Sequence, residues 1–280
     1  MSPMMPVPEP ALPAHLAPRV VAVFEEARRL QEEGKVTLAI ERLETTLKET
    51  SQEPQLANFK DRVSLAMAIA EFSVTAGDVP RALTGLAGEF TFAKAAFQEI
   101  KASGTEDDKR TAFRGLVQLR DFHTRLNLIG KSAPELAAKE WLNSSPLSWP
   151  DLKGRVVLLE FWATWCKPCE QMFPKLKSMH QDFSAQGLEV VAHTRYFMAY
   201  NAPAELQAQE MEMIRGFVNQ HSIGFPVAVS EDESVQTAYG ATALPIMALI
   251  DRQGLVRSFG FSPEDESFSQ SLQACLAEPA

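Results

Sequence analysis

The stretch that decides the fold is Trp162-Ala163-Thr164-Trp165-Cys166-Lys167-Pro168-Cys169. An apolar run over residues 156–161 precedes it and a helix-like pattern over residues 170–183 follows it. This order predicts a strand, a turn and a helix, with Cys166 at the exposed helix N-terminus, where unpaired N–H groups and the helix dipole stabilise a thiolate. Cys169 lies one turn further on, within disulfide reach. A nucleophilic thiolate and a resolving thiol are the minimum machinery of thiol-disulfide exchange.

Composition restricts the class of protein. The chain has 280 residues, 45% of them hydrophobic and 22% charged, which is enough for two ordinary soluble domains. A net charge of -9 argues against nucleic acid or an anionic membrane surface as partner, because either would favour a basic patch. All three cysteines lie after residue 160, so one functional pair with one spare thiol, Cys275, fits better than a disulfide-stapled scaffold.

The chain divides into three regions. Residues 1–14 are rich in proline and predict a disordered tail. Residues 15–126 carry apolar side chains at helical spacing and predict an all-α domain of five helices in hairpins, the last of which begins at a capping box formed by Thr105 and Asp108. Residues 127–280 alternate strands with helices and end in a hairpin, which predicts an α/β sheet covered on both faces.

Two turns of the helical region, at Gly34 and at Gly77, are similar to the inter-helix turn of tetratricopeptide repeats. They lie 43 residues apart, whereas that repeat has a period of about 34 residues. A peptide-binding repeat array and an irregular bundle that packs on the second domain are both open, because likeness of fold is weak evidence for a binding role.

Residues 130–276 resemble thioredoxin-fold proteins of the TlpA/ResA-like thiol-disulfide oxidoreductase family. The resemblance rests on the entry segment Gly130-Lys131-Ser132-Ala133-Pro134, the run from Leu152 to Cys169, Pro174, and Ala243-Leu244-Pro245. It implies a thioredoxin-like sheet, protein disulfides as substrates and a partner dithiol as electron donor. No cofactor and no metal are expected, since no flavin or nicotinamide site is evident and the chain offers no second pair of zinc ligands.

Glu160 is the candidate for proton transfer. It lies six residues before Cys166 in an otherwise apolar strand, at the position where thioredoxins carry a buried acid. A buried carboxyl has a raised pKa and can pass a proton to or from the resolving Cys169. The alternative is a glutamate that points to solvent at the end of the strand.

Pro245 resembles the cis-proline of the family, which packs against the disulfide and leaves the backbone of the preceding residue, here Leu244, free to pair with an extended substrate. A trans proline that opens a strand is the alternative. Family members often carry threonine directly after this proline, so Ile246 leaves the details of substrate binding open.

The residues around the dithiol have further expected roles. Lys167 adds positive charge next to the thiolate, and Pro168 stiffens the loop and has no N–H to donate. Trp165 is expected in an apolar rim on which a substrate rests, while Trp162 is expected in the core. Cys275 is expected to be a buried, inert thiol.

The segment after the second strand, from His193 through Arg195 and Tyr196 to Glu210, differs from the shorter acidic loop expected in the family. The sequence favours a solvated loop with one packed aromatic side chain, because loops vary freely. The alternative is a segment that shapes the choice of partner.

Two other functions compete with disulfide exchange. A thiol peroxidase shares the Gly130 to Pro134 entry, but it would need a threonine where this chain has Ala163. An interaction or redox-sensing protein would bind a client on the helical domain. Because residues 1–18 carry no apolar signal core, the chain as given is expected in the cytoplasm, with the periplasm or cell envelope as the alternative if an export signal has been removed.

Overall fold

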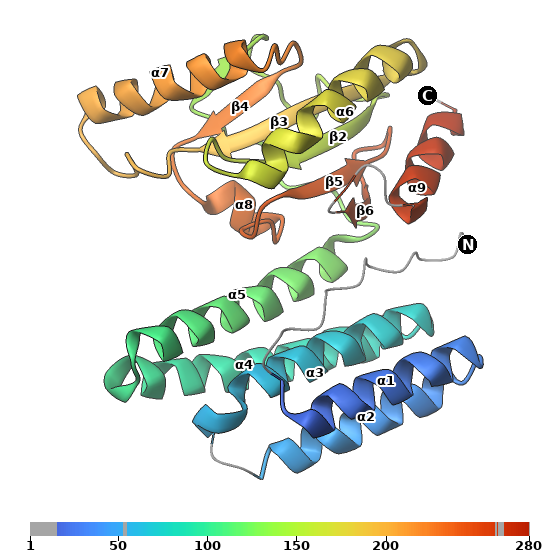
Figure 1. Ribbon diagram of the computed structural model, residues 1–280. Coiled ribbons are helices and arrows are strands. Elements are labelled where there is room, and N and C mark those ends of the chain that lie inside the picture. The colour runs from blue at the N-terminus through green and yellow to red at the C-terminus, as the bar shows by residue number, and fades with distance from the viewer. Residues whose placement is uncertain (1–15, 53–54, 261, 263–265, 280) are drawn as a thin grey trace. The chain divides into compact units, whose positions relative to one another are not determined.

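The computed structural model describes residues 16–52, 55–260, 262 and 266–279, so the predicted tail at residues 1–14 lies outside the described part of the chain. The chain divides into two compact units, residues 1–127 and residues 128–280 (Figure 1). The sequence places its domain boundary after Leu126.

Helices alone make up the described part of the first unit: α1 (Pro18–Glu32), α2 (Val36–Thr50), α3 (Gln55–Thr75), α4 (Val79–Ser103) and α5 (Glu106–Leu128). The first four pack in sequence, each against the next. Helix α3 serves two apolar cores, because Phe59 and Val63 pack with α4 and α5 while Leu65 and Ile69 pack with α1 and α2. The all-helical prediction is confirmed.

Local signals in the sequence set the helix ends. Gly34 and Gly77 adopt φ values of +75° and +79°, a left-handed conformation that side chains with a Cβ disfavour. The predicted capping box is present, since the Asp108 N–H donates to Thr105 Oγ1 (3.2 Å) and the Thr105 N–H donates to Asp108 Oδ2 (3.0 Å). The two hairpins share a turn but differ in length, with helices of 15 and 15 residues against 21 and 25. Only the turn therefore favours a repeat.

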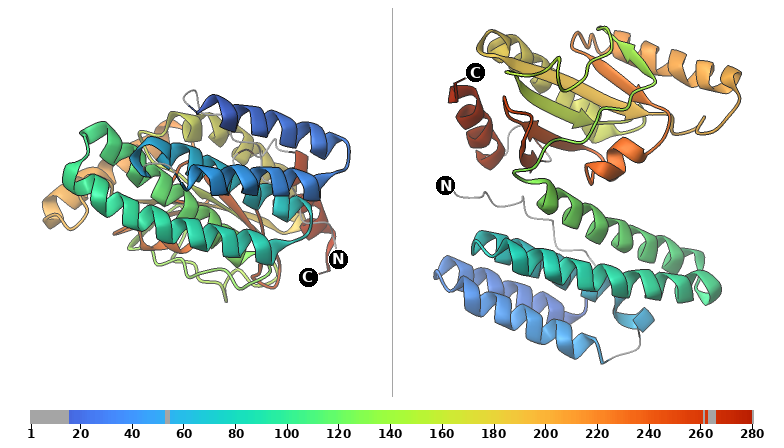
Figure 2. Two further views of the ribbon diagram at one scale, coloured as in Figure 1. Left: turned by 90° about the horizontal axis from the view of Figure 1, so that it is seen from below. Right: turned by 180° about the vertical axis from the view of Figure 1, so that it is seen from behind.

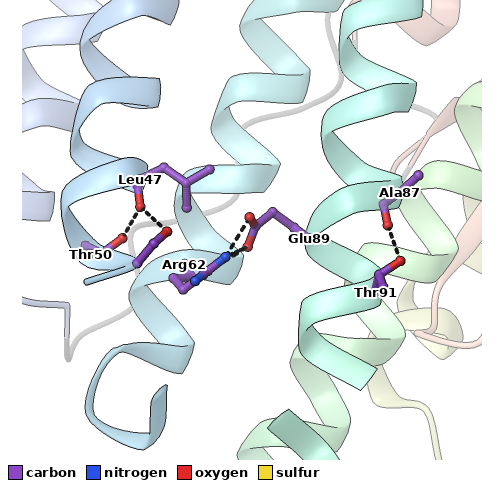
Figure 3. A network of polar contacts seen from close by, with 7 residues as sticks. Leu47, Thr50, Arg62, Ala87, Glu89 and Thr91 are labelled. Carbon is purple, nitrogen blue, oxygen red and sulfur yellow. Dashed lines mark hydrogen bonds and ion pairs between the residues drawn. The ribbon is translucent and has the colours of Figure 1, made fainter. Parts of the chain in front are cut away.

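A nearly buried ion pair links α3 to α4 (Figure 3). Arg62 donates from Nη2 to Glu89 Oε1 (2.8 Å) and from Nε to Oε2 (3.1 Å), and the two side chains are only 10% and 15% exposed. The Arg62 guanidinium also lies 3.4 Å from the centre of the Phe92 ring. A forked, desolvated pair of this kind fixes the register of the two helices.

We predict that Glu89→Ala lowers the free energy of unfolding of the helical unit by about 3 kcal/mol, because it leaves the Arg62 guanidinium buried without its carboxylate. Urea unfolding followed by circular dichroism measures this loss. The matched control is Glu26→Ala, which removes the half-exposed partner of Arg42 at 3.2 Å and should cost less than about 1 kcal/mol. Equal losses in both variants would contradict the prediction.

The second unit is built on a six-stranded sheet in the order β1-β4-β3-β2-β5-β6. Its strands are β1 (Glu140–Leu142), β2 (Val156–Phe161), β3 (Leu188–Arg195), β4 (Val227–Ser230), β5 (Ile246–Ile250) and β6 (Val256–Gly260). β2, β3 and β4 are parallel neighbours, while β1, β5 and β6 pair antiparallel. The predicted α/β sheet is confirmed. The sequence missed β1, because three residues at a sheet edge are too few to show a period.

Side chains of β2 alternate between two apolar layers. Val156 and Leu158 face a cluster built with α6 (Lys167–Phe183), α7 (Ala204–Gln220) and α9 (Glu266–Ala277). Leu159 and Phe161 face a cluster built with α8 (Ser234–Ala238) and the connector over residues 133–152. Figure 2 shows this connector, in green, crossing the sheet on the side away from α6. All six residues of β2 are buried, so the strand forms the centre of the unit.

None of the helices in the described ranges is both long and apolar enough to cross a lipid bilayer.

Candidate active site

The end of β2 and the start of α6 place Cys166. The strand stops at Phe161, the buried Trp162 and Ala163 begin the turn, and α6 starts at Lys167 with Cys166 as its N-cap. The backbone N–H of Cys169 donates to Cys166 Sγ at 3.3 Å. Pro168, which has no N–H, occupies the first turn, where its N–H would have no helical partner. The helix N-terminus therefore presents a donor and a positive dipole end to the Cys166 sulfur.

Cys166 and Cys169 form a disulfide, with their Cα atoms 5.3 Å apart. The two cysteines differ in access, because Cys166 is 4% exposed and Cys169 is not exposed at all. Cys166 is thus the more accessible of the two residues, which agrees with the prediction of Cys166 as the nucleophile and Cys169 as the resolving thiol. The third cysteine, Cys275, is buried in α9 and unpaired, and burial raises the pKa of its thiol to about 11.

The charge of Lys167 is partly balanced. Its Nζ lies 2.8 Å from Glu170 Oε2, and this hydrogen bond lowers the pKa of Glu170. Glu170 also lies 3.9 Å from His221 Nε2. The sequence predicts that Lys167 adds positive charge next to the thiolate, and the structure shows that this charge is paired with Glu170. The effect of Lys167 on Cys166 stays a prediction.

Glu160 is fully buried in β2. Its neighbours in the sheet, Ala192 of β3 and Met247 of β5, belong to the apolar cluster that also holds Cys166 and Cys169. Neither carboxylate oxygen has a hydrogen-bond partner among the described residues. Burial raises the pKa of Glu160 well above 4.5. The alternative of a solvent-facing glutamate is wrong, because the exposed fraction of this residue is 0%.

We predict that Glu160→Gln changes the pH dependence of stability. From pH 4.5, where the unfolded carboxyl ionises, up to the raised folded pKa, the folded state binds more protons than the unfolded state. Wild-type stability should therefore fall as pH rises through this window, by up to about 1.4 kcal/mol per pH unit. The Gln variant lacks this titration, so its advantage should grow from pH 4.5 to pH 7 in urea unfolding. Parallel curves for the two proteins would refute the assignment.

The Leu244–Pro245 peptide bond is cis, as the sequence predicts. Strand β5 begins directly after it, and Ile246 pairs with Phe161, the last residue of β2. The cis bond therefore lies beside the start of the cysteine loop. Leu244 packs against the apolar cluster that contains both cysteines. Pairing of the Leu244 backbone with a substrate stays a prediction.

The two tryptophans of the loop have different surroundings. Trp162 is buried, packed edge-on against Phe173 (5.3 Å between ring centres) and stacked on Phe217 of α7 (5.0 Å). Trp165 is 64% exposed and meets the ring of Phe197 edge-on at 5.3 Å. Trp162 is therefore core, as expected, and Trp165 lies at the surface directly beside Cys166.

His193 is a core residue. It is fully buried, its Nε2 lies 2.8 Å from Ser230 Oγ, and burial lowers its pKa to about 3. Its register partner is Phe161, whose side chain faces the cluster on the opposite side of the sheet from Glu160. His193 therefore stays neutral and away from the dithiol.

Sequence reasoning missed Phe197 and Glu210. Phe197 contacts Trp165, and Glu210 binds the backbone of the Phe197 segment, although the sequence favours a solvated loop here. The only available signal was an acidic residue on the helix face that carries the apolar residues Met211, Ile214 and Val218. In the described ranges, no three side chains of histidine, cysteine, aspartate or glutamate are grouped so that they could hold a metal ion.

Comparison with known proteins agrees with this geometry. Residues 129–259 match the model of the AhpC/TSA family. Thiol-disulfide oxidoreductase ResA of Bacillus anthracis is 35% identical over 129 residues, which covers 46% of this chain and 66% of the relative. ResA of Bacillus subtilis (strain 168) is 31% identical over 128 residues, covering 45% and 64%. The aligned segment thus spans less than two thirds of either relative.

Among solved structures, a Chlorobium tepidum protein provisionally assigned as thiol:disulfide interchange protein DsbE is 32% identical, with a TM-score of 0.43. The match covers 53% of this chain and 98% of that one. The ResA relatives are named thiol-disulfide oxidoreductases, and this chain forms a disulfide between Cys166 and Cys169 at the start of α6. In sequence, the segment over residues 129–259 is therefore similar to the thiol-disulfide oxidoreductases named ResA.

Proposed function

We propose that the chain is a thiol-disulfide oxidoreductase that reduces or exchanges disulfides in protein substrates. The observation that carries this proposal is the asymmetric pair at the N-terminus of α6. Cys166 is 4% exposed and its Sγ accepts a hydrogen bond from the Cys169 N–H, while Cys169 is fully buried. This is the arrangement that exchange requires, because one sulfur must meet the substrate and the other must be protected from it.

The reaction starts from the reduced dithiol. The Cys166 thiolate attacks one sulfur of the substrate disulfide, a mixed disulfide forms, and the first substrate sulfur leaves as a thiolate that takes up a proton. Cys169 then loses its proton and attacks Cys166 Sγ, which releases the second substrate sulfur. The protein loses two electrons, and the substrate gains them as two thiols. A partner dithiol returns the electrons by the reverse sequence.

Glu160 is suited to the proton of Cys169. It is fully buried between Ala192 and Met247, which belong to the apolar cluster of the dithiol, and burial raises its pKa toward that of a thiol. Transfer between groups of similar pKa needs little free energy. In this proposal the Glu160 carboxylate takes the proton of Cys169 when the mixed disulfide is resolved.

We predict that Cys169→Ser accumulates a mixed disulfide between Cys166 and the substrate, because the first attack proceeds and the resolving thiol is missing. Cys166→Ser should form no such adduct. The experiment incubates each reduced variant with insulin whose disulfides are intact and detects the adduct on non-reducing gels and by mass spectrometry. An adduct on Cys169 in the Cys166→Ser variant, at the wild-type rate, would refute the assigned roles.

We predict that Glu160→Gln slows the resolving step about tenfold or more at neutral pH and leaves the first attack nearly unchanged, because an amide cannot accept the proton of Cys169. Rapid quenching measures the two steps separately. The control is Glu189→Gln, since Glu189 lies on β3 beside Val157, at the other end of the strand pair, and pairs with Arg155 at 3.3 Å. Equal resolving rates in wild type and Glu160→Gln would disprove the proton role.

A client-binding or redox-sensing protein is the second candidate, because the helical unit contains a cavity of about 420 Å³. Its lining includes Phe59, Lys60, Asp61, Asp107 and Thr111. Full biological activity of Cys166→Ser would favour this function over exchange. A peroxidase is a weaker candidate, since Ala163 stands where that chemistry would need threonine. Peroxide consumption by the purified protein would reveal it. The compartment stays a prediction.

A further inference from the structure

The segment that follows β3, residues 196–202, is held in place by polar contacts from three directions. The Tyr196 hydroxyl, on a residue only 1% exposed, donates to Glu140 Oε1 of β1 at 2.9 Å. The Gln207 side chain of α7 donates to the Ala199 carbonyl at 3.4 Å. Arg195 donates to the Tyr196 carbonyl at 3.2 Å. A segment held by these hydrogen bonds has a defined conformation at the surface.

Glu210 of α7 supplies the central anchor. Its carboxylate accepts hydrogen bonds from three consecutive backbone N–H groups, at 2.8 Å from Phe197, 3.1 Å from Met198 and 2.7 Å from Ala199. The residue is 6% exposed. Successive N–H groups that converge on one anion form a concave site, and bonds to a charged acceptor are stronger than bonds to a neutral one. Glu210 therefore fixes the direction in which the side chains of the segment leave the backbone.

One result is a column of planar groups that ends at the cysteine loop. The Arg195 guanidinium lies 4.1 Å from the centre of the Phe197 ring, and Phe197 meets Trp165 edge-on at 5.3 Å. Arg195 is itself held by the buried Gln236 at 2.9 Å. The column begins at a fixed group in α8 and ends at the residue next to Cys166, so the position of Phe197 decides where Trp165 rests.

The same segment carries large apolar side chains into solvent. Among the described residues of the second unit, the exposed large apolar side chains belong to Trp165, Met198, Tyr200, Leu206 and Met213. Trp165 precedes Cys166, Met198 and Tyr200 lie in the anchored segment, and the other two lie on α7. Met198 is 64% exposed although its own N–H is bound to Glu210. Exposed apolar side chains on a backbone that hydrogen bonds hold in place are suited to a binding surface.

We propose that Glu210 is a positioning residue for substrate recognition, and the inference rests on the proposed exchange function. Glu210 holds Phe197 and Met198 so that Trp165 and Met198 form an apolar platform beside Cys166. Its occupant is an apolar segment that flanks the disulfide of a protein substrate. Cys166 is 4% exposed, so a substrate sulfur reaches it only by contact with the surface around it, and the platform is part of that surface. Flexible methionine and flat indole suit varied apolar sequences.

The test compares Glu210→Gln with Glu212→Gln. Glu212 lies two residues further along α7, its side chain is 77% exposed, and it pairs only loosely with Arg215 at 3.5 Å, so it is a matched control. Glutamine has the size of glutamate, but its NH₂ group would face backbone N–H groups and release part of the segment. The reduced proteins react with three probes: a disulfide-linked peptide with leucine and phenylalanine beside the cysteine, the same peptide with serine and glycine, and oxidised glutathione.

Wild type and Glu212→Gln should prefer the apolar peptide about tenfold over the polar one, as burial of one or two apolar side chains predicts. Glu210→Gln should lose most of this preference through a higher KM. Its kcat, its rate with glutathione and the equilibrium constant of its dithiol with glutathione should stay within about twofold of wild type. Met198→Ser should lose the preference and Met198→Leu should keep it, and these surface variants are expected to leave folding intact.

Each outcome decides between the claims. An unchanged preference in Glu210→Gln, or an equal loss with all three probes, would overturn the inference, since the latter would mean that Glu210 supports only the fold or the dithiol. A wild type that is active but shows no preference would overturn the inference and leave the proposed function standing. A wild type that reduces none of the probes would overturn both.

Discussion

The hydrogen bond from the Cys169 N–H to Cys166 Sγ depends on where one helix begins. Had α6 started one residue later, Cys166 would lie one residue outside the N-cap position and its sulfur would lose the N–H donor at the end of the helix dipole. The start of α6 is fixed in turn by β2, since a strand buried on both faces cannot shift without moving the whole sheet. The environment of the Cys166 sulfur thus depends on a fully buried strand.

The same strand supplies the opposite kind of environment for Glu160. A carboxyl without a polar partner is costly in the centre of a sheet, and an amide or an apolar side chain would satisfy packing there better. The proposed transfer of the Cys169 proton would give a reason for a carboxyl at this position. Glu160 and Cys169 are both fully buried, and the sheet neighbours of Glu160 belong to the apolar cluster that holds Cys169.

The sequence was sufficient where local rules decide the outcome. The strand, turn and helix around Cys166, the capping box at Thr105 and the left-handed turns at Gly34 and Gly77 each follow from neighbouring residues. The sequence was insufficient where a contact joins residues that are far apart along the chain. Glu140 meets Tyr196 across 56 positions, and the three-residue β1 exists only because β4 offers it an edge. The anchoring of the segment at residues 196–202 could not be predicted for the same reason, because Glu210 looks like an ordinary helix residue until the backbone N–H groups that it binds are known.

In the anchored segment, the backbone atoms that bind Glu210 differ from the side-chain atoms that face solvent. Glu210 accepts hydrogen bonds from backbone N–H groups, which every residue type except proline possesses, while the side chain of Met198 is exposed to solvent. Substitutions of Met198 can therefore accumulate without weakening the backbone hydrogen bonds to Glu210. Related proteins could therefore bind different substrates by changing a few surface side chains while they keep the same redox chemistry. Antibodies likewise keep their framework while their loops diversify.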